Sequence, residues 1–236
     1  MLIDLLTGQV SPMEILIRVF CVLLCITVHE VAHGYAAYKL GDNTAKNMGR
    51  LTLNPIPHID IVGGLAMLFA GFGWAKPVPV EPRNFTRKIS MRNGMALTAF
   101  AGPLSNLIFA FIVMIIMFAL RSFGVLEFLA IGGHFWMIPA PGTVHGTLMS
   151  IFITLIAMNL GLAIFNLIPV PPLDGSWILS AWLPNRLLFK YARIERVGFI
   201  VLIALLFLTP FGTFLGMIIR YIQMFYMWVI QLIPFF

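Results

Sequence analysis

Long apolar segments separated by short polar ones dominate the pattern of this chain. Apolar residues fill the stretches at about 12–40, 93–123 and 147–168, and each is long enough for a helix that crosses a membrane. Two further apolar stretches, at about 194–208 and 214–236, are separated by a turn that contains proline and glycine. The pattern predicts an all-α polytopic membrane protein with about five to six transmembrane helices.

Residues 61–82 break this pattern. They begin with a short, glycine-rich apolar piece and continue into Pro77-Val78-Pro79-Val80-Glu81-Pro82, where each proline lacks an N–H and disfavours helix in the residue before it. We expect a re-entrant or strand-like element at the membrane boundary. Irregular backbone is tolerated at membrane depth only where protein or a water-filled cavity shields it.

Composition supports the membrane assignment and orients the chain. Of the 236 residues, 60% are hydrophobic and 10% are charged, far from the values of soluble domains. The net charge of +6 falls in basic clusters at 39–60, 76–92 and 184–196, whereas the loop at 121–146 has one basic residue, Arg121. Such clusters predict cytoplasmic loops rather than nucleic-acid binding, and they place the N-terminus outside.

Two histidines and a carboxylate lie inside the first apolar segment. The run His29-Glu30-Val31-Ala32-His33 follows a stretch with no charge after Arg18. Ionisable groups at this depth are costly and indicate a functional site. Histidines four residues apart share one helix face and can bind one metal ion, and zinc hydrolases keep their general base beside the first histidine. The run predicts a zinc-dependent hydrolase with its active site inside the membrane.

A catalytic zinc takes three protein ligands, so the third must come from elsewhere in the chain. Asp174 is the best candidate, because it follows a helix end that three prolines break between residues 169 and 172. The alternative is an N-cap for a short amphipathic helix over about 175–182. Asn166 lies within the preceding apolar run. Its amide either donates to a developing oxyanion on the substrate or holds the broken helix end.

Other polar side chains near the apolar segments have simpler interpretations. Cys21 and Cys25 suit small buried packing positions, although Cys25 lies one turn before the first histidine and a role near the metal stays open. His58, in a proline-rich turn, is expected to hydrogen-bond locally. Asn106 and Asn159 have ordinary helix-packing explanations.

The histidine motif combined with Asn166-Leu167-Ile168-Pro169-Val170-Pro171-Pro172-Leu173-Asp174-Gly175 resembles the site-2 protease family of intramembrane zinc metalloproteases. Their signature pairs HExxH with a later NxxPxxxLDG, and both match without a substitution. Further family-like stretches lie at 49–55, 73–80 and 101–106. The resemblance covers about residues 20–185, and the chain is similar to a minimal form without a PDZ or CBS domain.

The resemblance implies hydrolysis of a peptide bond within or near a transmembrane helix of another membrane protein, as in regulated intramembrane proteolysis. Glu30 would be the general base and then the acid, and Asn166 would help to hold the substrate or its oxyanion. The implied partners are that substrate and membrane lipid. The basic loops place the site toward the cytoplasmic side, and we expect the membrane to be the plasma (inner) membrane of a prokaryote. One zinc ion would be bound by His29, His33 and Asp174.

We expect residues 1–236 to form one intramembrane metalloprotease domain, with a catalytic core over about 12–185 and C-terminal helices over about 194–236. Residues 61–82 would match the family's membrane-associated strand element, which pairs with an unwound substrate. The alternative function is a membrane metal-binding or transport protein that uses the same His/Asp site. A transporter would need further polar groups along a path through the other helices.

Overall fold

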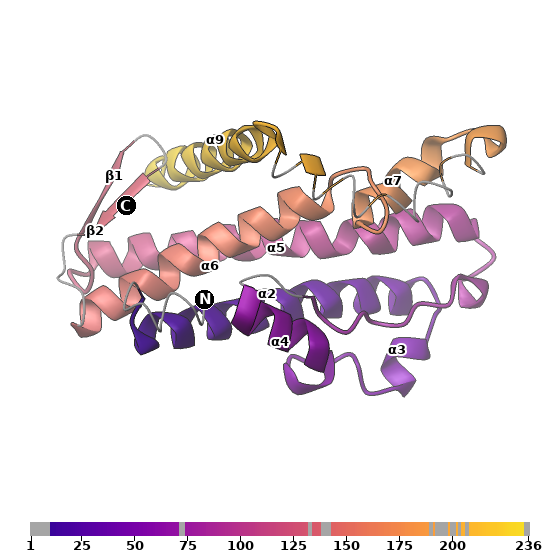
Figure 1. The fold of residues 1–236 in the computed structure, drawn as a ribbon, viewed down its shortest axis with the longest axis horizontal. Coiled ribbons are helices and arrows are strands. Elements are labelled where there is room, and N and C mark those ends of the chain that lie inside the picture. The colour runs from indigo at the N-terminus through magenta and orange to yellow at the C-terminus, as the bar shows by residue number, and fades with distance from the viewer. Residues whose placement is uncertain are drawn as a thin grey trace.

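We describe the protein from a computed structural model, which places residues 10–70, 74–131, 134–137, 143–188, 191, 198, 202, 204–205 and 208–233. In this part of the chain, four helices are long and apolar enough to cross a membrane: α2 (Pro12–Lys39), α5 (Met91–Ser122), α6 (Val144–Asn166) and α9 (Phe211–Gln231). Helices α2, α5 and α6 run side by side, and α9 packs against α5 and α6 (Figure 1). The predicted all-α polytopic fold is confirmed. The predicted span at about 194–208 lies largely outside the described residues.

Local sequence signals set the N-terminal ends of these helices. Ser11 and Glu14 form a capping box at the start of α2, in which each side chain accepts a hydrogen bond from the other's backbone N–H, at 3.2 and 3.1 Å. Ser90 and Thr143 cap α5 and α6 through their side-chain oxygens. The predicted starts therefore lie close to the observed ones.

The bundle has a tightly packed interior and an apolar exterior. Side chains without exposed surface include Cys21, Ala110, Met114, Ile156 and Leu160. On the outer side of α5, three isoleucines at four-residue spacing are 45–50% exposed: Ile108, Ile112 and Ile116. A continuous exposed apolar stripe is expected where a helix face contacts lipid rather than water.

The segment between α2 and α5 differs from the prediction in its first half. Residues Ile61–Ala70 form the helix α4, so a strand-like reading of this half is wrong. The carboxylate of Asp60 accepts the backbone N–H of Gly63 at 2.8 Å and so caps the first turn of this helix. Residues 74–81 contain no helix or turn: Ala75 pairs with Ile59 in an antiparallel bridge and Glu81 has extended backbone angles, in line with the prediction from the prolines. We call residues 74–81 the extended segment.

The remaining elements are short. They are α3 (Thr44–Asn47), η1 (Ile56–His58), η2 (Pro82–Asn84), β1 (Phe128–Ile131), β2 (His134–Met137) and α7 (Asp174–Trp182). Strands β1 and β2 form an antiparallel hairpin within the predicted outer loop, at the opposite end of the bundle from α3 and α7 (Figure 1). His58 is buried and its Nε2 lies 3.0 Å from the carbonyl of Thr52, so the predicted local contact is confirmed.

Helix α7 begins one residue earlier than the sequence predicts. Leu173 is its N-cap and Asp174 is its first helical residue, so the alternative reading of Asp174 as an N-cap is wrong. The next residue, Gly175, is required by close packing, because a Cβ at this position would lie 2.3 Å from the carbonyl oxygen of Leu167. The chain therefore folds back tightly before α7, and the carboxylate of Asp174 is free to point into the bundle.

Helix α7 is held against α5 at its other end. The guanidinium of Arg92, on α5, donates hydrogen bonds to the backbone carbonyls of Ser180 and Leu183. These carbonyls lie at the C-terminal end of α7, where a cation also interacts favourably with the helix dipole. Both ends of α7 are thus anchored, which fixes the position of Asp174.

Candidate metal centre

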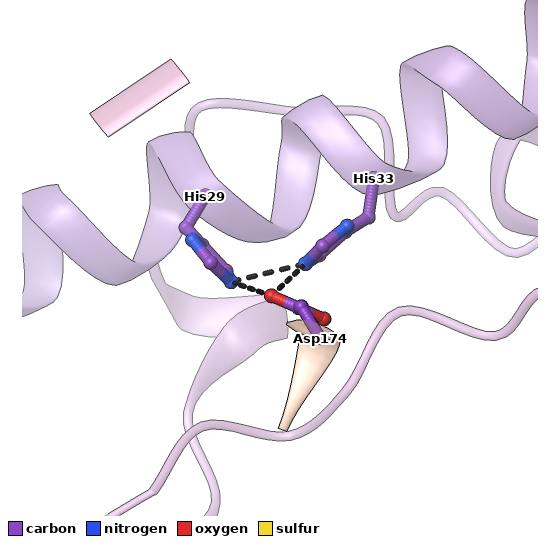
Figure 2. Close-up of side chains that lie close together, drawn as sticks. All are labelled: His29, His33 and Asp174. Atoms are coloured by element: carbon purple, nitrogen blue, oxygen red, sulfur yellow. Dashed lines mark hydrogen bonds and ion pairs between the residues drawn. The ribbon is translucent and has the colours of Figure 1, made fainter. Parts of the chain in front are cut away.

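His29 and His33, one turn apart on α2, meet Asp174 at the start of α7 (Figure 2). The two Nε2 atoms lie 3.0 Å apart. The Oδ2 atom of Asp174 lies 3.1 Å from Nε2 of His29 and 3.3 Å from Nε2 of His33. The structure therefore brings together the three residues that the sequence predicts as metal ligands.

The hydrogen bond of His33 determines which of its nitrogens faces this group. Its Nδ1 lies 2.7 Å from the backbone carbonyl of Thr98 on α5. Because a carbonyl oxygen only accepts, Nδ1 must carry the proton, and Nε2 of the neutral ring then presents a lone pair. That lone pair points toward Asp174.

A chain of buried amides fixes His29 in the same way. Its Nδ1 lies 2.6 Å from Oδ1 of Asn106. The Nδ2 of Asn106 donates to the carbonyl of Cys25 at 3.1 Å and to Oδ1 of Asn159 at 2.7 Å, and Nδ2 of Asn159 donates to the carbonyl of Leu155 at 2.8 Å. Since each carbonyl can only accept, both amide orientations are determined. Nδ1 of His29 must donate, so its Nε2 also presents a lone pair.

With both rings neutral, three electron-pair donors therefore converge on one point. Oδ2 of Asp174 is buried and accepts no hydrogen bond from the described residues. Such an arrangement is costly unless a cation compensates it. A tetrahedral zinc ion with bonds of about 2.0–2.2 Å would space its ligand atoms roughly 3.3–3.6 Å apart. The observed separations of 3.0–3.3 Å are close to this, so the donor set fits zinc.

Helix α5 approaches the two histidines through Gly102. A Cβ at this position would lie 2.4 Å from Nε2 of His33 and 2.7 Å from Cε1 of His29. No side chain fits between the α5 backbone and the two rings. The glycine therefore allows α5 to cover the site and to bring Asn106 and Thr98 into contact with the imidazoles.

The carboxylate of Glu30 contacts the extended segment 74–81. Its Oε2 accepts the backbone N–H of Val78 at 2.8 Å. The segment is held again by Arg50, which is 5% exposed and donates through Nη2 to the carbonyl of Lys76 at 2.7 Å. The predicted general base thus lies between the histidines in sequence and beside the extended segment in space.

Asn166 makes a contact within its own helix. Its Nδ2 donates to the carbonyl of Leu162 at 3.0 Å, in the last turns of α6. This bond matches the expectation that the amide holds the broken helix end. The amide carries a second hydrogen, so its predicted role toward a substrate remains a prediction.

Sequence reasoning missed the partners of the two histidines. It assigned Asn106 and Asn159 to helix packing, and Thr98 acts through its backbone carbonyl, which no side-chain pattern reveals. The available signal was the family-like stretch 101–106, which ends at Asn106. Cys25 contacts this network, since its Sγ lies 3.0 Å from Nδ2 of Asn159, but it is not among the three residues that meet at the site.

Two imidazoles and a carboxylate around one point, with a glutamate beside the first imidazole in sequence, are the side chains that a zinc hydrolase requires, and here they lie in a bundle of apolar helices. The chain belongs to peptidase family M50, whose sequence profile matches residues 17–209. The predicted resemblance to site-2 proteases is therefore confirmed.

Two relatives extend this result. The chain is 43% identical over 196 residues to "Putative zinc metalloprotease YwhC" of Bacillus subtilis, and the match spans 83% of this chain and 82% of that protein. It is 29% identical over 202 residues to "Putative zinc metalloprotease Rip2" of Mycobacterium tuberculosis, over 83% of this chain and 69% of the relative. No solved structure matches with comparable significance.

Proposed function

We propose that this protein is a zinc-dependent endopeptidase that cleaves a peptide bond within or near a transmembrane helix of another membrane protein. The observation that carries the proposal is the convergence of three potential ligand atoms, from His29, His33 and Asp174, in a chain that places Glu30 directly after the first histidine. The names of the curated relatives, which mention zinc and proteolysis, support the choice of metal and of reaction.

Each residue has a role in the proposed reaction. When bound by the three ligands, zinc supplies a Lewis acid and lowers the pKa of water toward ~7. Glu30 takes a proton from the attacking water at a carboxylate oxygen as the new C–O bond forms. It then gives this proton to the leaving nitrogen as the C–N bond breaks. Asn166 donates its second amide hydrogen toward the developing oxyanion.

The extended segment 74–81 is proposed to receive the substrate. A transmembrane helix must unwind locally before hydrolysis, because its backbone groups are internally bonded in lipid. A strand-like segment in contact with the general base offers backbone groups to the unwound chain. Substrates with helix-weakening residues such as Gly, Pro or Asn near the cleaved bond should therefore be preferred.

The site is proposed to open toward the cytoplasm across the plasma (inner) membrane of a prokaryote. The basic segments 39–60 and 76–92 and the helix α7 lie at one end of the bundle, and the hairpin lies at the other (Figure 1). The positive-inside tendency assigns the basic end to the cytoplasm. The catalytic core over about 12–185 and the C-terminal helices over about 194–236 are proposed to act as one domain.

The test compares metal content and cleavage of a single-span substrate by purified protein. We expect Glu30→Gln to keep one zinc per chain but to lose cleavage by a factor of about 10²–10⁴, because the proton-transfer step loses its base. We expect His33→Ala to lose both metal and activity, and Asp174→Asn to bind metal more weakly. Glu127→Gln, an exposed position beside β1, is the matched control and should retain both.

Retained cleavage in Glu30→Gln would remove the proposed mechanism. Unchanged zinc content and turnover in Asp174→Asn would show that another residue is the third ligand. Wild-type protein that binds zinc through these residues but cleaves no more substrate than Glu30→Gln would identify the chain as a metal-binding or transport protein instead.

A further inference from the structure

A cavity of about 810 Å³ lies beside the metal centre, between the N-terminal part of α5 and α7. Its walls are mainly apolar and include Met91, Met95, Trp177 and Leu188. Its volume is that of a ligand pocket, far more than one water molecule needs. The metal ligands themselves do not line it.

The cavity adjoins the metal centre through α7. Pro172 lies two residues before Asp174 and Trp177 lies three residues after it, and both are on the cavity wall. Three residues make about one helical turn, so the indole projects from the turn that carries the metal ligand. The wall is therefore positioned by the same tight chain reversal that positions Asp174.

The cavity also adjoins the extended segment. Val78 is hydrogen-bonded to Glu30, and Pro82, four residues later, is part of the wall. Four extended residues span about 13 Å at ~3.3 Å per residue. A substrate chain can therefore lie extended beside this segment with one of its residues next to Glu30. The substrate residue about four positions further along would then reach the cavity.

Arg92 contributes the cationic part of the wall, but its guanidinium is engaged. It donates to the backbone carbonyls of Ser180 and Leu183 and serves to hold the end of α7. The surface that remains for recognition is formed largely by Met, Leu, Pro and Trp side chains. Such a surface suits apolar side chains, which a transmembrane substrate supplies in abundance.

We propose that this cavity is a specificity site, which takes a large apolar side chain of the substrate three to five residues from the cleaved bond. The proposal rests on the proposed function and adds to it a substrate class: membrane-protein segments with Leu, Phe or a similar residue at that distance. Met95 and Trp177 determine the size of the accepted side chain.

The first part of the test maps this preference on purified wild-type protein. Positions three to five residues away on both sides of the cleaved bond are changed one at a time to Ala, Leu and Phe. At one position we expect kcat/KM to be about tenfold or more higher for Leu and Phe than for Ala, the range that apolar pockets give for a few buried carbon atoms.

The second part changes the cavity. Met95→Trp narrows the cavity. We expect it to reduce the preference for the Phe substrate, measured as its kcat/KM divided by that of the Ala substrate, by about tenfold. Leu97→Trp is the matched control, because Leu97 is on the same helix, is 53% exposed and does not line the cavity. Trp177→Ala enlarges the cavity and should shift the preference toward Trp. Its control is Trp182→Ala, on the same helix and 84% exposed.

Zinc content is measured in all four variants, so that a disturbed metal centre is distinguished from altered selectivity. A wild-type protein without side-chain preference at these positions would overturn the proposal, as would the same shift in the control variants. A cavity filled by lipid would leave the preference unchanged in Met95→Trp and Trp177→Ala, which also overturns it. Each of these results leaves the proposed protease function intact, whereas wild-type protein that cleaves no substrate better than Glu30→Gln overturns both.

Discussion

At the scale of single residues, the metal centre depends on atoms that do not touch the metal position. His29 and His33 each use Nδ1 for a hydrogen bond to α5, one to the amide of Asn106 and one to the carbonyl of Thr98. These bonds fix the ring orientation, so both Nε2 atoms are directed at Asp174 before any metal binds. The apolar surroundings strengthen such bonds and make an unpaired partner costly.

Removing the amide of Asn106 should therefore weaken metal binding without removing a ligand. We expect Asn106→Ala to lower zinc affinity about 10–100-fold, the usual effect of losing such a partner. The measurement is a competition between the purified protein and a chelator of known affinity. Ser105→Ala is the control, since the hydroxyl of Ser105 donates to the carbonyl of Gly102 in its own helix and not to an imidazole. Equal affinities in the two variants would contradict the orienting role.

Gly102 gives a second test at this scale, because its effect is steric. In Gly102→Ala the new methyl group would overlap both imidazole rings, at 2.4 and 2.7 Å, so the rings must move away from Asp174. We expect loss of stoichiometric zinc and of cleavage, while the far-UV circular dichroism of the helices is retained. Gly161→Ala on α6 is the control: apart from its own helix, no described residue has an atom within 4 Å of the new Cβ, so the variant should be neutral or slightly stabilising. Full zinc content in Gly102→Ala would contradict the close approach.

The difference between predictable and unpredictable parts of the site follows from this geometry. His29, Glu30 and His33 are predictable because one helix and a fixed spacing determine their relation. Asp174 required the second motif and the proline-broken helix end. Asn106 was not predictable as a partner of His29, because that contact depends on how α5 is rotated against α2, which a single apolar helix pattern leaves undetermined.

At the scale of elements, short segments depart from the sequence-based expectation more than long helices. Residues 61–70 form a helix although they contain two glycines, and the Asp60 cap offsets part of the helix-weakening effect of those glycines. The hairpin of β1 and β2 was not predicted, since four-residue strands carry little periodic signal. The extended segment 74–81 was predictable, because prolines restrict their own backbone and that of the preceding residue.

Asp42 joins two of these short elements to α2 outside the membrane-spanning helices. It has no exposed surface. Its carboxylate accepts hydrogen bonds from the hydroxyl and the N–H of Thr44 at 2.5 and 3.0 Å, the amide of Asn84 at 2.9 Å and the N–H of Glu81 at 2.7 Å. Burial alone would raise its pKa, but these hydrogen bonds outweigh burial and lower the pKa below its usual value of 3.8.

A lowered pKa means that ionised Asp42 stabilises the fold above pH 3.8 and that this stabilisation is lost as the pH falls below it. We expect Asp42→Asn to lower the free energy of unfolding in detergent by about 1–3 kcal/mol at pH 7, since donors then face an amide. The difference from wild type should shrink as the pH falls below 3.8. Asp60→Asn is the control. An asparagine side chain can still cap α4, so we expect little change in the free energy of unfolding. A difference for Asp42→Asn that does not depend on pH would contradict the assignment.

At the scale of the whole molecule, the metal centre joins parts of the chain that are far apart in sequence. His29 and His33 belong to the first spanning helix, Asp174 belongs to α7, and α5 lies across both through Gly102 and Arg92. Bound zinc would link α2 to α7 across the bundle. Without zinc, only the contacts between the two imidazoles and the carboxylate remain at this point.

Metal removal should therefore lower the stability of the entire protein, and not only its activity. A ligand that binds the folded state alone stabilises it by about 4 kcal/mol at 1,000 times its Kd. We expect a strong chelator to lower the Tm of the wild-type protein in detergent by several degrees, and added zinc to restore it. Glu30→Gln should respond like wild type, because it keeps all three ligands, whereas His33→Ala should have a Tm that neither chelator nor zinc changes. An identical response in wild type and His33→Ala would mean that the metal which stabilises the protein is bound elsewhere.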